Sequence, residues 1–134
     1  MRKSTAKWVR KAEADRAIAV SIAASKTSLH DGVCFHCQQC AEKYLKGLLE
    51  ELVLDIPKTH DLERLQEMLE LHYPTLRSLV RGLKFLSNFA VTTRYPGEDA
   101  TQRQAKAALR WMDRIRTMVR TILALPPKSK KSSS

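Results

Sequence analysis

Hydrophobic residues recur along most of the chain at intervals of three and four positions, the spacing of an amphipathic α-helix. The first stripe predicts a helix over about residues 5–25. One face of that helix carries Trp8, Ala12, Asp15, Ala19 and Ile22. Asp15 is the charged exception in a stripe that otherwise faces the core. A connection over about 26–32 separates this helix from the next one.

A second helix is expected over about 33–53. Its apolar stripe comprises Cys34, Gln38, Ala41, Leu45, Leu48 and Leu52. Five residues fall within an arc of roughly 80° on the opposite side, at 100° per residue: His36, Gln39, Lys43, Lys46 and Glu50. The pattern therefore predicts one buried face and one polar, basic outer face. An unpaired amide is costly on the apolar side, so we expect Gln38 to find a hydrogen-bond partner.

Two shorter helices are expected to follow. Thr59 is suited to be the N-cap of the first. Its inward face comprises Leu62, Leu65 and Leu69. Tyr73-Pro74 ends it, because proline disfavours helical geometry in the residue before it. Thr75 then caps a helix that extends to about residue 90.

The last helix is expected to begin near Glu98 and Asp99, after the turn TRYPG over 93–97, and to extend to about residue 125. Its apolar seam comprises Ala105, Ala108, Met112, Ile115, Val119 and Ile122. A separate basic line comprises Arg103, Lys106, Arg110 and Arg114. Two interpretations of that line are open: a solvated helix face, or a contact with backbone phosphates.

Helices of this length joined by short connections predict an all-α fold. We expect an up-and-down antiparallel four-helix-type bundle with one additional short helix, about five helices in all. The 134 residues fit one domain, over 1–125. The remainder, 126–134, is expected to be a disordered basic tail of serine and lysine. Only 4 glycines and 5 prolines argue against an all-β sandwich or a Rossmann domain, which need many turn residues.

The chain is strongly basic, with a formal net charge of +10. That excess indicates an anionic partner: nucleic acid, nucleotide phosphate or an acidic protein. No apolar run approaches the ~20 residues of a membrane-spanning helix, and the basic N-terminus has no apolar segment typical of a secretory signal. We therefore expect no membrane partner. Three cysteines within seven residues make a poor disulfide framework, so we expect a cytoplasmic protein.

Four local patterns could carry chemistry. The cysteines Cys34, Cys37 and Cys40 have zinc-like spacing, but on a helix they fan across about 120° and cannot converge on one ion. We expect small buried side chains there, and neither a metal site nor a cofactor. His36 is either a surface or interface histidine or, with Cys40 four positions on, a nucleophile–base pair.

His60 stands at a helix start, where it is either part of the capping turn or a contact to an anionic ligand. Arg94-Tyr95-Pro96 is the sharpest local signal. Arginine and an aromatic ring on a rigid turn can hold a phosphate and stack a base. The alternative is an Arg94 paired with Asp15 or a glutamate, and a Tyr95 packed on the end of the bundle.

The segment 34–46, CFHCQQCAEKYLK, resembles the central helix of HEPN domains, whose pattern is FHxQQxxEKxLK. Segment 57–62, PKTHDL, is similar to the family's P-x-T-H-x-L, and TRYP over 93–96 to its RYP turn. The resemblance covers about residues 5–125. It implies a helical bundle that commonly dimerises and is often encoded beside a minimal nucleotidyltransferase.

A large branch of that family comprises ribonuclease toxins with an Arg-x4-6-His signature before the last long helix. This sequence lacks that signature: no histidine has an arginine five to seven positions upstream. We therefore expect no catalytic residues and a non-catalytic module that binds nucleotide or RNA phosphate, as a homodimer beside a nucleotidyltransferase-type partner. The predicted ligand or interface residues are Arg94, Tyr95, His36, Lys43 and His60.

Two alternatives stay open. One is a toxin-type endoribonuclease with a non-standard site that uses His36 or His60. The other is an antitoxin-like module that binds protein only. The sequence names neither the ligand nor the partner.

Overall fold

The computed structural model describes residues 1–91 and 95–127, and within them every regular element is a helix. In chain order the elements are α1 (Lys3–Ala24), α2 (His30–Glu51), α3 (Leu62–Leu69), the 3-10 helix η1 (Pro74–Leu79), α4 (Val80–Ser87) and α5 (Gln102–Ile122). The all-α expectation is confirmed. The predicted Arg94 and the tail from residue 128 onward lie outside the described residues.

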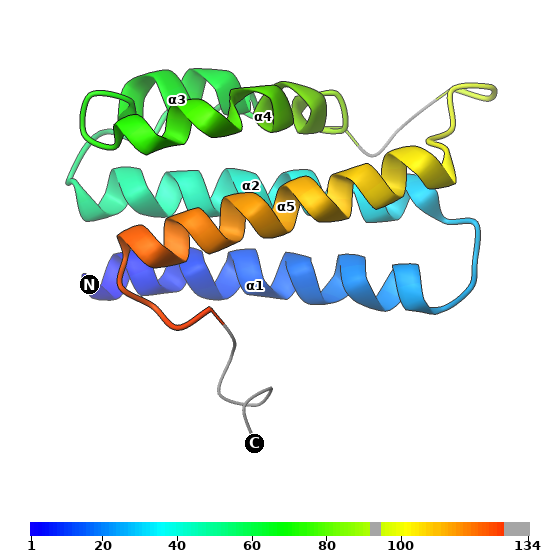
Figure 1. The fold of residues 1–134 in the computed structure, drawn as a ribbon, viewed down its shortest axis with the longest axis horizontal. Helices are drawn as coiled ribbons and strands as arrows, with labels where there is room; N and C mark the ends of the chain where they lie inside the picture. Colours follow the sequence, from blue (N-terminus) through cyan, green and yellow to red (C-terminus); the bar gives the residue numbers. More distant parts are fainter. Residues whose placement is uncertain (92–94, 128–134) are drawn as a thin grey trace.

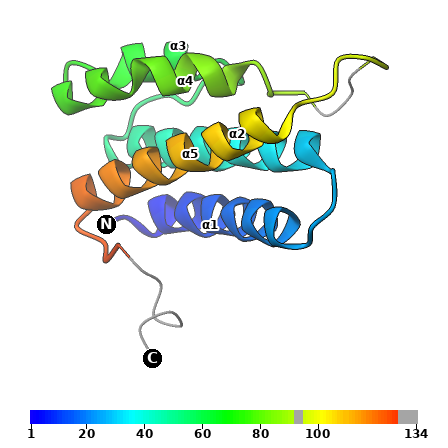
Figure 2. The same ribbon diagram turned by 45° about the vertical axis from the view of Figure 1, so that its right-hand side comes forward.

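The helices form a bundle in which α2 and α5 lie between α1 on one side and the α3–α4 pair on the other (Figures 1 and 2). Side-chain pairs fix the directions. Glu13 and Arg16 on α1 bond Arg116 and Asp113 on α5, so these helices are antiparallel. In chain order α1, α2, η1–α4 and α5 alternate in direction, as the helix lengths and short connections predicted, and α3 is the additional short helix.

The central helix α2 is buried on nearly all sides, because α1, α3, α4 and α5 all pack against it. The sequence predicted an exposed polar stripe on α2, and this expectation is wrong. Lys46 in that stripe is only 8% exposed, and His36, Gln39, Lys43 and Glu50 are half-buried. The reason is tertiary: α1 covers one edge of the stripe, and the segment before α3 covers the other.

The helix starts differ from the sequence-based expectations. Asp61, not Thr59, caps α3, because its carboxylate accepts hydrogen bonds from the backbone amides of the first turn. Thr75 caps nothing: Pro74 begins a 3-10 turn, and the expected helix to residue 90 is divided into η1 and α4. A capping box between Thr101 and Gln104 starts α5, three residues later than predicted.

The last helix also ends earlier than the expected position near residue 125. The helix α5 stops at Ile122, and the chain turns back on itself after Ala124, whose φ is 57°. The carbonyls of Pro126 and Pro127, the expected first residues of the disordered tail, accept hydrogen bonds of 2.6 Å from Arg120 and Arg116. Two arginines of α5 therefore fix the segment just beyond the helix against it.

Candidate functional site

A buried carboxylate brings two of the predicted ligand residues together. Asp15, 6% exposed on α1, lies with its Oδ1 2.8 Å from Nδ1 of His36 on α2. Its other oxygen, Oδ2, accepts a hydrogen bond from Nζ of Lys43, which lies about two helical turns further along α2. Asp15 is thus the charged exception of the α1 stripe because it meets two basic side chains of α2. The positive charge of Lys43 is therefore compensated inside the protein.

A second buried carboxylate holds His60. Oε1 of Glu42 lies 2.8 Å from Nδ1 of His60, and Oε2 accepts a 3.0 Å hydrogen bond from Lys46. Gln38 Nε2 donates to the same Glu42 at 3.2 Å and to the backbone carbonyl of His60 at 3.1 Å. The expected partner of Gln38 is therefore present. The imidazole of His60 stays 64% exposed, on a carboxylate separate from the one that holds His36.

The turn before α5 carries the remaining predicted residues. Tyr95 is 75% exposed, so it does not pack on the end of the bundle as one interpretation had it. Asp15, one of the partners that this interpretation offered to Arg94 besides a glutamate, is bonded to His36 and Lys43. Arg94 itself lies outside the described residues. Of the five predicted residues, the structure brings His36 and Lys43 together and places His60 and Tyr95 elsewhere.

The cysteines are buried, as the sequence predicted. Cys34, Cys37 and Cys40 have no exposed surface and form no disulfide. Burial raises the pKa of the Cys37 thiol and lifts that of Cys40 well above its ordinary value. A thiol held protonated in this way cannot serve as the nucleophile of a His36–Cys40 pair. Among residues 1–91 and 95–127, no three His, Cys, Asp or Glu side chains are grouped to hold a metal ion.

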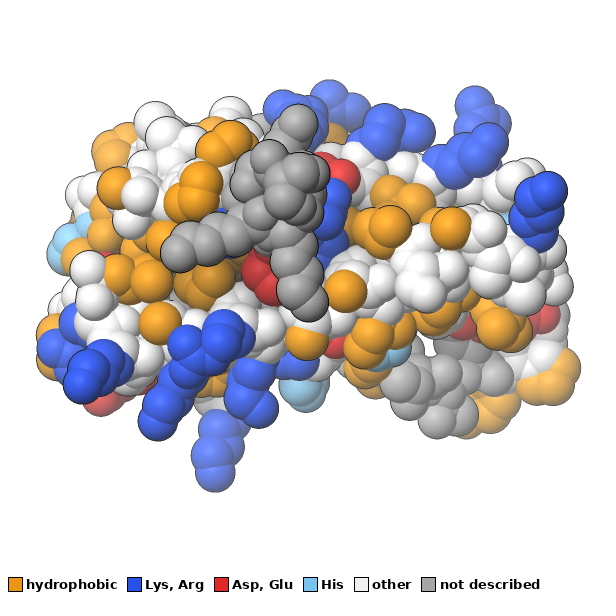
Figure 3. Space-filling model, turned by 90° about the horizontal axis from the view of Figure 1, so that it is seen from below, with side chains coloured by type: hydrophobic (Ala, Val, Ile, Leu, Met, Phe, Trp, Pro, Cys, Tyr) orange, Lys and Arg blue, Asp and Glu red, His pale blue; other side chains and the backbone are white. Residues whose placement is uncertain are grey.

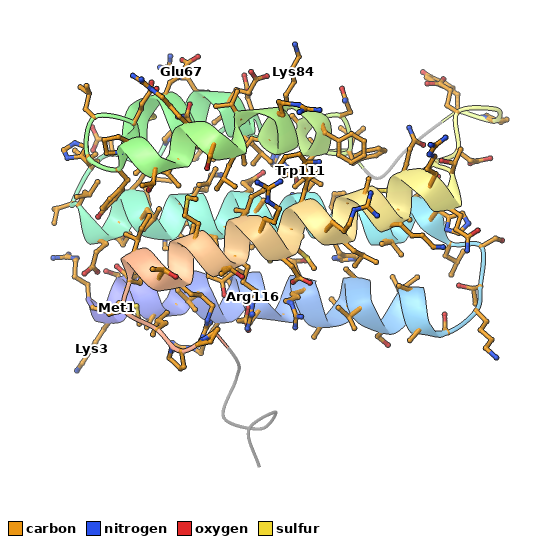
Figure 4. All side chains as sticks on the ribbon, in the orientation of Figure 1. Met1, Lys3, Glu67, Lys84, Trp111 and Arg116 are labelled. Carbon is orange, nitrogen blue, oxygen red and sulfur yellow. The ribbon has the colours of Figure 1, made fainter. Side chains whose placement is uncertain are left out.

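Sequence reasoning missed a largely buried ionic network that joins α1, α2 and α5. Arg116 donates two hydrogen bonds to Glu13, of 2.7 and 2.9 Å, and Tyr44 OH donates a third of 2.6 Å. Arg120 Nη1 in turn donates to the Tyr44 hydroxyl at 3.1 Å. Figure 4 shows Arg116 on the side of α5 that faces α1. In the sequence, the network could have been inferred from Arg116 and Arg120, two arginines four residues apart at the border of the apolar seam of α5.

The contacts within this network shift the pKa values of its members. Burial acts to raise the pKa of Glu13, but the hydrogen bonds from Arg116 and Tyr44 outweigh it and hold that pKa below its ordinary value. The hydrogen bond to Glu13 raises the pKa of Arg116. Burial and the same carboxylate raise the pKa of Tyr44. The network therefore consists of a carboxylate, two guanidinium groups and a neutral phenol at physiological pH.

The basic line on α5 lies at the surface, unlike the ionic network around Glu13. Arg103, Lys106, Arg110 and Arg114, here named the α5 row, are all exposed. Within the described residues none of them forms an ion pair with a carboxylate, and Arg114 instead lies 4.5 Å above the Trp111 ring. Space-filling Figure 3 shows lysine and arginine side chains projecting from opposite edges of the face seen from below. The α5 row is thus a run of positive charge that the fold leaves uncompensated.

None of the helices in the described part of the chain has the length and apolar character that crossing a membrane requires.

This chain is similar to known proteins both in its sequence and in its fold. The family model described as "HEPN domain" matches residues 5–122. TT1696 from Thermus thermophilus has a similar crystal structure, with a TM-score of 0.77 and 23% identity over 90% of this chain and 98% of that one. ST0689, an archaeal HEPN homologue, gives a TM-score of 0.73 and 24% identity over 92% and 99%. At such identities the likeness shows the fold. No curated protein matches the sequence significantly.

Proposed function

Because the chain belongs to the HEPN domain family, we propose that it is a non-catalytic module that binds the phosphates of a nucleotide or an RNA. In this proposal it is a cytoplasmic homodimer that acts beside a nucleotidyltransferase-type partner protein. The fold supports the family-level part of this proposal, and the charge distribution supports the choice of ligand. The partner rests on the family resemblance.

One observation carries the choice of ligand: none of the four cations of the α5 row has a carboxylate partner among the described residues. Lys43, Lys46, Arg16 and Arg116 each pair with a carboxylate. Four uncompensated cations on one helix face attract an anion with several charges. An RNA backbone suits them, because each phosphate contact releases a counterion.

The residues predicted from the sequence keep distinct roles in this proposal. Arg94 binds phosphate, and the exposed Tyr95 stacks on a base or positions it. Asp15 accepts a hydrogen bond from Lys43 and compensates its charge, so His36 and Lys43 supply hydrogen bonds to a ligand. His60, largely exposed on its Glu42 partner, offers its second ring nitrogen to a ligand or interface.

The experiment that tests the proposal is binding of a single-stranded RNA at several salt concentrations. Wild type is compared with Arg103→Gln/Arg110→Gln, with Arg94→Ala, and with the charge-matched control Lys7→Gln/Lys11→Gln on α1. Each phosphate contact adds about 0.7 to the slope of log affinity against log salt for single strands. We expect the α5 variant to lose affinity and to flatten that slope by about 1.4, while the control keeps both.

Other outcomes are equally informative. A salt slope unchanged in the α5 variant overturns the choice of surface, and equal affinity of Arg94→Ala and wild type removes Arg94 from the site. No RNA or nucleotide binding at low salt, together with tight binding to a protein partner, favours the antitoxin-like alternative. Light scattering tests the homodimer.

The endoribonuclease alternative has one observation in its favour. Nδ1 of His60 is bonded to the buried Glu42 while much of the ring is exposed, as in a histidine that a carboxylate orients for general base catalysis. RNA cleavage by the purified protein, abolished by His60→Ala and unaffected by a chelator, would establish that alternative. Intact RNA after prolonged incubation supports the non-catalytic proposal.

A further inference from the structure

A pocket opens where the end of α1, the α1–α2 connection and the starts of α2 and α5 meet. Its volume is about 630 Å³, within the range of about 300–1,000 Å³ typical of small-molecule sites. Its apolar wall comprises Ile22, Ala23, Val33, Ala105 and Leu109. Val33 and Ala105 are 2% and 5% exposed, so this part of the wall belongs to the packed core and is fixed in position, whereas Ala23 is exposed.

The rest of the pocket is polar and carries only one sign of charge. Lys26 and Lys106 line it together with His30, two hydroxyl residues and Gln102. No aspartate or glutamate of the described residues lines it. Neither lysine forms an ion pair with a carboxylate in the described part of the chain. An apolar wall beside uncompensated cations suits an amphipathic anion, with a flat or aliphatic body and a phosphate.

The pocket is continuous with the α5 row. Lys106 belongs to both, and at 100° per residue Ala105 and Leu109 lie on the adjoining face of the same helix. The row extends from Arg103 to Arg114, about 16 Å along the helix axis at ~1.5 Å per residue. The surface thus joins a strip of cations, long enough for several phosphates, to a pocket with room for a base.

We propose that this pocket binds the terminal nucleotide of an RNA strand whose neighbouring phosphates lie along the α5 row. The inference rests on the proposed function and adds to it that the protein recognises RNA ends. The terminal base packs on the wall formed by Val33, Ala105 and Leu109, and Lys26 and Lys106 bind its phosphate. A terminal nucleotide enters with a single backbone connection, whereas an internal one must be flipped out of the strand with the backbone bent on both sides, which costs free energy.

The test compares a short linear oligoribonucleotide with the circle obtained by ligating its own ends, at fixed salt. The pocket is filled by Ala23→Phe, since Ala23 is an exposed residue of α1 that lines the pocket. Ala24→Phe is the matched control, because Ala24 is also exposed on α1 but does not line it. Both substitutions avoid the core, and thermal unfolding of each variant checks that it folds.

We expect wild type and Ala24→Phe to bind the linear strand about tenfold more tightly than the circle, the gain from one buried base. Ala23→Phe should bind both forms with the affinity of wild type for the circle. Equal affinity of wild type for both forms would overturn the inference while leaving the proposed function intact. Failure to bind either form would contradict the proposed function itself.

Competition with a free nucleotide distinguishes the two ligands that the pocket could take, the end of an RNA strand and a free nucleotide. Adenosine monophosphate should compete with the linear strand more strongly than with the circle, because it occupies the pocket alone. If it binds wild type but not Ala23→Phe, and the linear strand has no advantage over the circle, then the pocket takes a free nucleotide and recognition of RNA ends is overturned. If Ala23→Phe keeps its preference for the linear strand, the ends bind elsewhere.

Discussion

The indole ring of Trp111 fills the space that a side chain on Gly82 would need. A β-carbon on Gly82 would lie 2.1 Å from Cε3 and 2.3 Å from Cδ2 of Trp111, far inside van der Waals contact. Figure 4 shows Trp111 on the side of α5 that faces α4. The absence of a side chain at Gly82 therefore sets how closely α4 approaches α5, which carries the row of cations on its exposed face.

Gly82→Ala should destabilise the protein by about 2 kcal/mol, because overpacking costs about 1–3 kcal/mol and exceeds the better helix propensity of alanine. Urea unfolding of the variant measures this loss. In a Trp111→Ala background the same substitution should be neutral or stabilising, since the clash is gone. Equal losses in the two backgrounds would mean that the ring moves aside without cost.

Acid should weaken the contact between α1 and α5. The pKa of Glu13 in the folded protein is held below its ordinary value near 4.5, so its contribution to stability is complete above that value. The contribution is lost as the pH falls through the folded pKa, because the unfolded chain binds the proton first.

Glu13→Gln should therefore lower the free energy of unfolding at pH 7 by about 2 kcal/mol and flatten its decline below pH 4.5. Urea unfolding at a series of pH values measures both effects. Asp55→Asn, at an exposed carboxylate, is the control and should leave the pH profile unchanged. A Glu13→Gln profile parallel to that of wild type would contradict the assignment.

The three cysteines should be inert in the folded protein. All are buried, and burial keeps the Cys37 and Cys40 thiols protonated at pH 8. A disulfide-exchange reagent should release no chromophore on mixing with native protein and three equivalents in denaturant. Rapid reaction of one equivalent with native protein would show that the segment around α2 opens locally.

The end of α2 carries a strained residue. Val53 has a φ of 57°, and the hydrogen bonds from Val53 N to Glu50 O and from Leu54 N to Leu49 O close a Schellman motif around it. A β-branched residue is disfavoured in this left-handed region, and the Val53 side chain is 67% exposed. Val53→Gly should therefore stabilise the protein by about 1 kcal/mol.

Thermal and urea unfolding both measure that gain. Ala124→Gly at the corresponding position after α5, where φ is also 57°, should give a smaller gain because alanine is not β-branched. Loss of stability in Val53→Gly would indicate that contacts of the valine outweigh its backbone strain.

The sequence by itself determined the helices, their order and much of the core. Periodicity reports which face of one helix is apolar, and this local property correctly placed the buried cysteines, the need of Gln38 for a partner and the exposed α5 row. It predicted helix ends less well, because Thr59 and Asp61 are both good caps and only the packed chain selects Asp61.

Only the tertiary structure determined which charged side chains form ion pairs within the protein. Asp15 meets His36 and Lys43 across 21 and 28 residues, and Glu13 meets Arg116 across 103. Such pairs depend on how helices pack, which no local pattern encodes. Packing also turned the polar stripe of α2 inward and left the α5 row without carboxylate partners among the described residues. The sequence thus set the amount of positive charge, and packing decided which part of it remains available to bind an anion.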